Sequence, residues 1–447
     1  MENLKHVEKA LSSGGFVLVL DTGAVIDAQA EAMLQALHSR STGGIKSHLE
    51  ILKKKGAENF MEKFYVGYGH KSIGDCGSAT IFVEGVSMLA AKAIQDWRLY
   101  SGQEASTRYV DFSKQAFINP LQTEEGNTIL ENWRTFYLNA QKPIQEHLKK
   151  QNPRQEGEDE KMYDKAIIAR AFDITRSFLP AGASTNLAWR MNLRQFADKL
   201  MLLRHHPLEE VREIAEKTEE ALQTMYPQSF SHLRFEHTEK YNASIMEKHY
   251  YVHEKAEKFS VLFDGVNRQV LEETRQYLEE RPIKTELPPT LAETGVLTYE
   301  FLLDFGSFRD IQRHRAVVQR MPLLTRTHGF HDWYLNSLPE DLRAEALEFL
   351  DKQKARIDAL ETSEEVKQYY TAMGYRVPCR VTGDIKALVY LAELRSSRFV
   401  HPTLVEQAIN IIHDLKNRFS EYGLVIHQDD EPNRFDIRRG EQDIVLK

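Results

Sequence analysis

Residues 72–84 read SIGDCGSATIFVE, and residues 290–301 read TLAETGVLTYEF. Both stretches contain a hydroxyl residue, an acid three positions later, a glycine two positions after the acid, and a threonine three positions further on. An apolar run follows in each, and such a run between turn residues predicts a strand. We therefore predict an internal duplication in which each copy contains one such strand.

The sequence continues in the same order after each strand. An arginine-bearing helix follows, with Arg98 in the first copy and Arg309, Arg313 and Arg315 in the second. Each copy then ends in an apolar helix that closes on arginine and on a His-Pro pair: Leu200, Leu203, Arg204, His206 and Pro207, then Leu391, Leu394, Arg395, His401 and Pro402. This order predicts copies at residues 1–235 and 255–425 and a polar tail at 426–447.

The predicted fold class is α+β, helix-rich, with a small sheet in each half. Short apolar runs predict strands at 16–20, 80–83 and 297–303. Apolar residues near a spacing of 3.6 predict the helices, over residues 25–55, 129–150, 161–178 and 208–225. Residues 151–161 contain no large apolar residue and predict a solvated loop.

Composition excludes several classes of protein. The 447 residues are 42% hydrophobic and 28% charged, as in ordinary globular chains, and a net charge of −8 argues against nucleic acid or an anionic membrane as partner. Cys76 and Cys379 are too few for a disulfide framework or a zinc site. Because neither a signal peptide nor a run of about 18 apolar residues occurs, we expect a cytoplasmic protein. The 17 histidines are scattered without the spacing of metal ligands, so we expect no metal site.

Arginines are concentrated in the second copy. Five of them lie between residues 309 and 326, against a single acid, Asp310. Arg309 and Arg313 would share one face of a helix. Guanidinium groups suit phosphates and the edge of a pyrimidine, so this segment is a candidate nucleotide site. A solvated basic face is the alternative interpretation.

The first copy contains a different polar set. Glu104, Ser106 and Arg108 alternate, so in an extended loop their side chains point the same way. A carboxylate, a hydroxyl and a guanidinium together can bind the base, sugar and phosphate of a nucleotide. A capped helix end is the alternative.

These residues carry a family resemblance. Residues 69–109 resemble the flavin-dependent thymidylate synthases, the ThyX family, in a Gly-His-x-Ser start and in a loop that ends in arginine and tyrosine. The matching positions are Gly69, His70, Ser72, Ser101, Glu104, Ser106, Arg108 and Tyr109. Arg176 to Pro180, Asn192 to Arg194, and Leu203-Arg204 match further family motifs in order. Residues 260–420 resemble the same family more faintly, through Arg313-His314-Arg315, Arg395 and His401.

Each copy departs from the family in a different part. Asp96-Trp97-Arg98 stands where the family has Arg-His-Arg. The second copy keeps that triplet, but Val318, Arg320, Met321, Leu323 and Thr325 replace the polar loop. We infer that the halves are complementary and build one composite site, while the other pseudo-equivalent site is lost. Cys76 and Thr294 occupy the place of a family histidine.

The resemblance implies reductive methylation of dUMP at C5, with FAD as cofactor and with NADPH and methylenetetrahydrofolate as co-substrates. The implied flavin contacts are Arg313, His314, Arg315, Asn192, Arg194 and Ser101. Glu104, Ser106, Arg108 and Arg176 would bind the nucleotide, and either Arg395 or Arg204 would activate the pyrimidine. The family's assembly implies a homodimer with four-copy pseudo-symmetry. The alternatives are a flavin enzyme acting on another uridylate and a non-catalytic nucleotide- or flavin-binding homologue.

Overall fold

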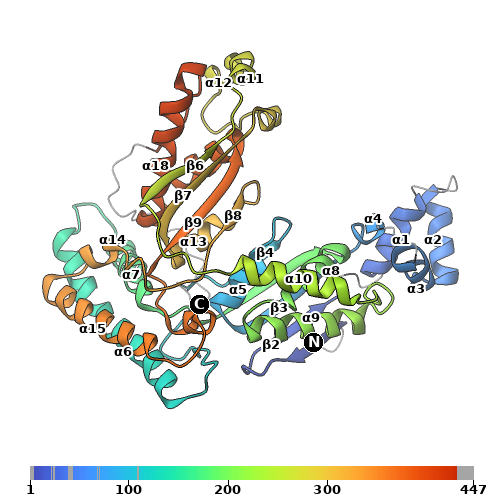
Figure 1. Ribbon diagram of the computed structural model, residues 1–447, viewed down its shortest axis with the longest axis horizontal. Helices are drawn as coiled ribbons and strands as arrows, with labels where there is room; N and C mark the ends of the chain where they lie inside the picture. The colour runs from blue at the N-terminus through green and yellow to red at the C-terminus, as the bar shows by residue number, and fades with distance from the viewer. Residues whose placement is uncertain are drawn as a thin grey trace. The chain divides into compact units, whose positions relative to one another are not determined.

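The computed structural model describes residues 5–429 except 22, 24–25, 39–43, 68, 70 and 108–109. The chain divides into two compact units, shown in Figure 1. Unit 1 comprises Met1–Ile118 and Gly182–Tyr251, and unit 2 comprises Asn119–Ala181 and Val252–Lys447. The α+β class with two halves is confirmed, but residues 119–181, which the sequence assigns to the first copy, pack with the second half.

Unit 1 is built on a five-stranded antiparallel sheet. Its strands are β1 (His6–Ala10), β2 (Phe16–Leu20), β3 (Ser78–Ser87), β5 (Ser184–Asn192) and β4 (Ser101–Glu104), in that spatial order. Val19, Ile81 and Trp189 lie side by side across three strands and are fully buried. This face is covered by helices that follow the strands: α5 (Met88–Gln95), α8 (Leu193–Leu203) and α9 (Glu209–Met225).

The described part of unit 1 contains six further helical segments of 3 to 14 residues. They are α1 (Ala28–His38), α2 (Gly44–Lys55), α3 (Glu58–Phe60), η1 (Met61–Gly67), α4 (Lys71–Gly74) and α10 (Glu236–His249). Leu37, Ile51 and Phe60 pack around Met33, which explains the apolar spacing seen in the sequence. The single helix predicted over residues 25–55 is two helices in the structure, α1 and α2.

Unit 2 repeats the sheet of unit 1 with one strand fewer. Its antiparallel strands are β6 (Phe259–Asp264), β7 (Val296–Asp304), β9 (Arg376–Asp384) and β8 (Val318–Arg320), in that spatial order. Helix α13 (Phe305–Ile311) follows β7 as α5 follows β3, and α17 (Ile385–Arg395) and α18 (Pro402–Phe419) follow β9 as α8 and α9 follow β5. The short helices α11 (Arg268–Glu273), α12 (Arg275–Glu279), η4 (Pro289–Thr294) and η6 (Ser420–Tyr422) pack against α17, α18 and one another.

The same helix caps recur in both units. The side chain of Asn192 accepts a hydrogen bond from the amide three residues later and begins α8, as Asp384 does for α17. Nδ1 of His206 accepts from the amide two residues later at 3.1 Å, and Nδ1 of His401 does so at 3.4 Å. His401 is the N-cap of α18, whereas α9 begins after Leu208, so the two His-Pro pairs share this local hydrogen bond but only His401 caps a helix.

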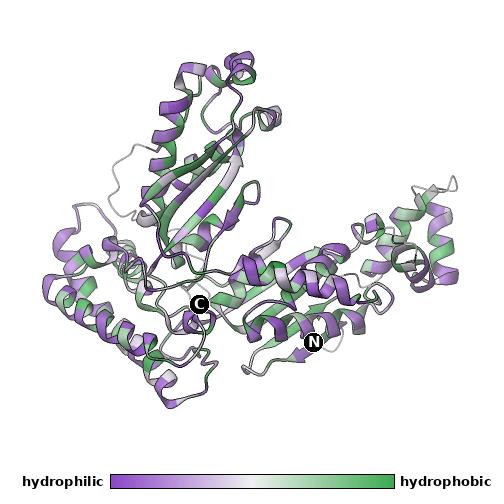
Figure 2. Ribbon diagram, viewed as in Figure 1, coloured by the Kyte–Doolittle hydropathy of each residue, from purple (hydrophilic) through white to green (hydrophobic). Residues whose placement is uncertain are grey.

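A helical layer completes unit 2. It contains α6 (Glu124–Gln151), α7 (Glu160–Thr175), α14 (Asp332–Asn336), α15 (Glu340–Asp358) and α16 (Glu364–Lys367). Figure 2 shows polar and apolar residues alternating around α6 and α15, as expected of helices with one buried face. The ring of Phe136 stacks on Phe349 at 4.5 Å, and Trp133 meets Phe349 edge-on at 5.0 Å. This aromatic contact explains why residues 119–181 leave the first half.

Two single-turn helices, η3 (Arg176–Phe178) and η5 (Gln368–Tyr370), mark a local two-fold symmetry inside unit 2. The amide of Ala181 donates to the carbonyl of Thr371 at 2.9 Å, and the amide of Met373 donates to that of Leu179 at 2.8 Å. Ala181 and Met373 each stand three residues before the next strand, so the two bonds are equivalent. Reciprocal bonds of this kind are typical of an isologous contact between two copies.

Candidate functional site

The last residue of α17, Arg395, contacts a buried histidine in the loop after α13. Nε of Arg395 donates to Nε2 of His314 at 2.7 Å, and Nη2 donates to the backbone carbonyl of Asp310 at 2.8 Å. Because the guanidinium can only donate, this ring nitrogen of His314 is the acceptor. Burial and the charge of Arg395 lower the pKa of His314 to about 3, so the imidazole is neutral.

Two arginines flank this histidine. Arg313 and Arg315 are exposed, whereas His314 between them is buried. Burial lowers the pKa of Arg395, and the neighbouring charge of Arg313 lowers it further, while Asp310 opposes both effects. The sequence triplet therefore presents two guanidinium groups around one buried imidazole, next to a third guanidinium.

Arg176 of η3 joins the same neighbourhood, although it comes from the first half of the sequence. Its Nε and Nη2 are buried and form no hydrogen bond within the described part of the chain. Burial alone would lower the pKa of Arg176, but Tyr334, Asp173 and Asp310 raise it. Asp310 thus acts electrostatically on Arg176, Arg395 and His314 alike. We call these residues, with Arg313 and Arg315, the arginine cluster.

A buried hydrogen-bond network supports Arg176. One carboxylate oxygen of Asp304 accepts from the hydroxyl of Tyr334 at 2.9 Å, and the other accepts from Thr403 at 2.6 Å. Nε2 of His401 lies 3.2 Å from the carbonyl of Asp173. Every member of this network already has partners, so its role is to hold α13, η3 and α18 together. The network fixes the backbone that carries Arg176.

Unit 1 uses Arg204 differently from Arg395. Arg204 donates to both carboxylate oxygens of Glu239, at 2.8 and 2.5 Å, and Glu219 lies 3.5 Å away. These partners line a small cavity of about 190 Å³. The hydrogen bond from Arg204 lowers the pKa of Glu239 to about 2, although partial burial opposes this. A guanidinium engaged in this way has little capacity left for a substrate.

The other predicted residues of unit 1 lie apart from this cavity or are already engaged. Asn192 caps α8, and Arg194, at the cavity wall, binds Asp75 at 2.8 Å. Glu104 accepts from Gln95 at 2.8 Å at the end of β4. Ser101 and Ser106 are exposed, and Arg108 lies outside the described residues.

In the first copy, Asp96 of the Asp96-Trp97-Arg98 triplet belongs to a cluster of ions. Asp96 lies 3.6 Å from Lys92 and 3.5 Å from His249, and Nζ of Lys199 donates to its backbone carbonyl. Burial would raise the pKa of Asp96, but Lys92 and the other cations hold it well below its ordinary value. Burial lowers the pKa of Lys199 to about 8. The lysines within the apolar helices α5 and α8 were the sequence signal for this cluster, and our sequence reading missed it.

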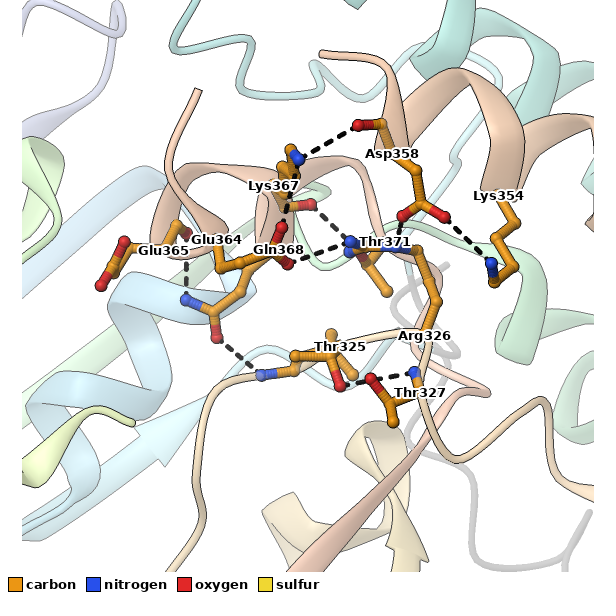
Figure 3. A network of polar contacts seen from close by, with 11 residues as sticks. Thr325, Arg326, Thr327, Lys354, Asp358, Glu364, Glu365, Lys367, Gln368 and Thr371 are labelled. Carbon is orange, nitrogen blue, oxygen red and sulfur yellow. Dashed lines mark hydrogen bonds and ion pairs between the residues drawn. The ribbon is translucent and has the colours of Figure 1, made fainter. Parts of the chain in front are cut away.

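The segment of the second copy that stands in place of the family's polar loop contacts other residues of unit 2, and Figure 3 shows these contacts around Arg326. Arg326 donates to Asp358, Thr371 and Glu364 at 2.8 to 3.0 Å. Gln368 stands eight residues before β9, as Arg176 stands eight before β5, and its side-chain oxygen accepts from the amide of Leu324. The position equivalent to Arg176 is therefore occupied by an uncharged residue with internal partners.

The part of the chain that the structure describes contains neither a metal-ion cluster nor a membrane-spanning helix. No group of three or more His, Cys, Asp or Glu side chains within residues 5–429, as described, could hold a metal ion. Over the same residues, no helix combines the length and apolar character needed to cross a membrane.

Comparison with known proteins finds similarity to one family model and to uncharacterised relatives. Residues 24–228 match the family model described as "Thymidylate synthase complementing protein". A UPF0159 protein of Chlamydia muridarum is 25% identical over 428 residues, covering 80% of this chain and 78% of the relative. A UPF0159 protein of Thermoplasma acidophilum is also 25% identical, covering 81% of this chain and 87% of the relative. Residues 24–228 are therefore similar to the thymidylate synthase complementing proteins, and the chain over about four fifths of its length is similar to UPF0159 proteins.

Proposed function

We propose that the arginine cluster of unit 2 binds dUMP and FAD and that the protein methylates dUMP at C5. The balanced reaction converts dUMP, methylenetetrahydrofolate, NADPH and a proton into dTMP, tetrahydrofolate and NADP⁺. One observation carries this proposal. Arg176, Arg395 and His314 were predicted separately as contacts to phosphate, pyrimidine and flavin, and in the structure the charge of Asp310 acts on all three while its backbone carbonyl accepts from Arg395.

The donor set of the cluster fits phosphate-bearing ligands. Arg176 has two buried nitrogen atoms without a partner in the described chain, and a buried unpaired guanidinium nitrogen is costly unless an acceptor arrives. The exposed Arg313 adds a second cation that a phosphate could reach. FAD and dUMP both supply phosphate oxygens as acceptors, so the residues fit these ligands.

The proposed roles follow from the contacts. Arg176 would bind the phosphate of dUMP, and Arg313, His314 and Arg315 would hold the flavin, which when reduced supplies the hydride. Arg395 is oriented by His314 and by the carbonyl of Asp310, so its guanidinium can stabilise negative charge that develops on the pyrimidine. We assign this role to Arg395 because Arg204 is occupied by Glu239 and Glu219.

The predicted site residues of unit 1 are further candidates for ligand contacts, with less support from the structure. Glu104, Ser106 and Arg108 remain our candidates for the sugar and base of the nucleotide, and Ser101 for the flavin. Asn192 and Arg194 are weaker candidates, since a helix cap and an ion pair already occupy them.

Flavin absorption and dTMP formation by the purified chain test this proposal. The purified full chain should carry yellow flavin absorption, and with NADPH and methylenetetrahydrofolate it should convert dUMP to dTMP. UMP in place of dUMP tests the other uridylate. A colourless protein that neither binds added FAD nor turns over dUMP would overturn the proposal.

A non-catalytic nucleotide-binding role is the second candidate, and the family histidine position favours it. Thr294 there is buried and donates to the carbonyl of Leu291 at 2.7 Å. Burial and the nearby Asp75 raise the pKa of Cys76, so its thiol stays protonated. Neither side chain replaces an imidazole. This candidate predicts binding of FAD and dUMP without dTMP formation.

A further inference from the structure

Unit 2 contains a large pocket that the proposed reaction does not use. It lies between α17 and the segment that follows α12, and its volume is about 800 Å³. Its apolar wall consists of Ile283, Leu287, Val389, Tyr390 and Leu394. Three of these side chains are unusually open to solvent, with Ile283 67%, Tyr390 45% and Leu394 44% exposed. A pocket of this size and lining suits a small organic ligand.

Almost all charged side chains that line the pocket form ion pairs with other residues of unit 2. Buried Arg281 pairs with Glu393, and Lys386 lies 2.7 Å from Glu286. Asp429 lies 3.9 Å from Arg398. Lys284 is the lining cation for which the described residues provide no carboxylate. Counted together with Arg398, the described charges at the pocket are four cations and three carboxylates, which leaves Lys284 as the cation in excess.

The backbone holds Lys284 in a defined place. Its φ angle is 62°, in the left-handed region that a non-glycine residue rarely adopts and that occurs often at binding sites. Nη1 of Arg281 donates to the carbonyl of Thr285 at 2.8 Å, and the amide of Thr285 lies 3.3 Å from the carbonyl of Pro282. The turn is thus tied to the Arg281–Glu393 pair, and Lys284 stands on a fixed loop beside Ile283.

We propose that this pocket binds a flat, mostly apolar molecule that carries one anionic group. The rings would lie between Ile283 and the exposed face of α17 formed by Tyr390 and Leu394. The anionic group would pair with Lys284. This site is separate from the arginine cluster, although the ring of Tyr390 packs edge-on against His314 at 5.9 Å. The proposal does not depend on the proposed reaction.

Anilinonaphthalene sulfonate tests it, since this fluorescent probe has flat apolar rings and one sulfonate. We expect saturable binding to one site on the full chain, measured by fluorescence titration and calorimetry. Lys284→Gln should weaken it at least tenfold, because a charge-assisted contact is lost. Ile283→Trp, which fills the mouth, should weaken it as much. Lys352→Gln is the matched control, because Lys352 lies on the exposed face of α15, and this variant should bind like wild type.

An uncharged probe tests the apolar contact of the pocket separately from the ionic contact with Lys284. Phenylnaphthylamine has the same rings without the sulfonate, so Ile283→Trp should weaken its binding and Lys284→Gln should not. Circular dichroism and urea unfolding confirm that the variants are folded. Equal affinity of the sulfonate probe for wild type and both pocket variants would overturn the site. Equal losses of both probes on Lys284→Gln would overturn the choice of an anionic ligand.

Discussion

Replacement of Arg395 by glutamine would remove the guanidinium that connects His314 to the carbonyl of Asp310. The change deletes hydrogen bonds of 2.7 and 2.8 Å and one positive charge, while the side chain keeps much of its length. A charged hydrogen bond is worth about 1.5–3 kcal/mol, and the loss of one preorganised donor to a developing anion lowers kcat by roughly 100- to 1000-fold. We therefore expect dTMP formation to fall by about that factor, in a steady-state assay at saturating dUMP.

The same variant has a readout that does not need turnover. Burial and the charge of Arg395 hold the pKa of His314 at about 3. Glutamine leaves the burial and removes the charge, so the pKa should rise towards its ordinary value of about 6.5. Titration of the His314 ring by NMR, with His314→Gln to assign the signal, measures the shift.

Arg204→Gln is the matched control for the catalytic assignment. It breaks the contacts with Glu239 and Glu219 and should lower the free energy of unfolding, but kcat should stay close to wild type. The assignment is refuted if Arg395→Gln keeps turnover within about threefold of wild type in conditions where wild type is active. It is equally refuted if Arg204→Gln loses as much kcat as Arg395→Gln.

Four further outcomes are expected. Arg176→Gln should raise the Kd for dUMP at least tenfold, measured by calorimetry, because the phosphate loses its buried guanidinium; an unchanged Kd contradicts the phosphate role. Arg313→Ala with Arg315→Ala should weaken FAD at least tenfold in a fluorescence titration without unfolding the chain, since both side chains are exposed. The pKa values of His314 and His401 are about 3, so these neutral imidazoles stabilise the fold above pH 6.5, and this contribution is lost as the pH falls towards 3. Each histidine should lower the free energy of unfolding by about 2 kcal/mol between pH 6.5 and 5, measured by urea unfolding, and His314→Gln should reduce this dependence of stability on pH. Light scattering at micromolar concentration should give twice the chain mass of 51.7 kDa, and a monomer would argue against the dimer.

Local patterns predicted much of the fold. Strands 16–20, 80–83 and 297–303 correspond to β2, β3 and β7, because short runs of alternating or continuous apolar residues are stabilised when a sheet buries them. The helices over 129–150 and 208–225 correspond to α6 and α9 for the same reason. The place of α6 and α7 in unit 2 could not be predicted. It depends on contacts such as Phe136 with Phe349, which lie far apart in the sequence and leave no local pattern.

The candidate site was predictable in its parts but not in its assembly. Arg176, His314 and Arg395 stand out by motif, and each motif suggests a role. Their meeting around Asp310 requires that a segment of the first half pack with the second. Asp310 was visible in the sequence as the one acid among the arginines, but its electrostatic role needed the structure.

The packing of residues 119–181 with the second half has a consequence for how the gene can be divided. Two genes split at the junction between Tyr251 and Val252 would each encode one sequence copy, yet the first product would carry Arg176 and the apolar faces of α6 and α7 away from the fragment that needs them. Neither product would be a self-sufficient protein, and assembly would depend on their concentrations in the cell. In the single chain the two parts are covalently linked, so their association is intramolecular and does not depend on protein concentration. A break of the gene at this junction would therefore separate α6 and α7 from the unit with which they pack.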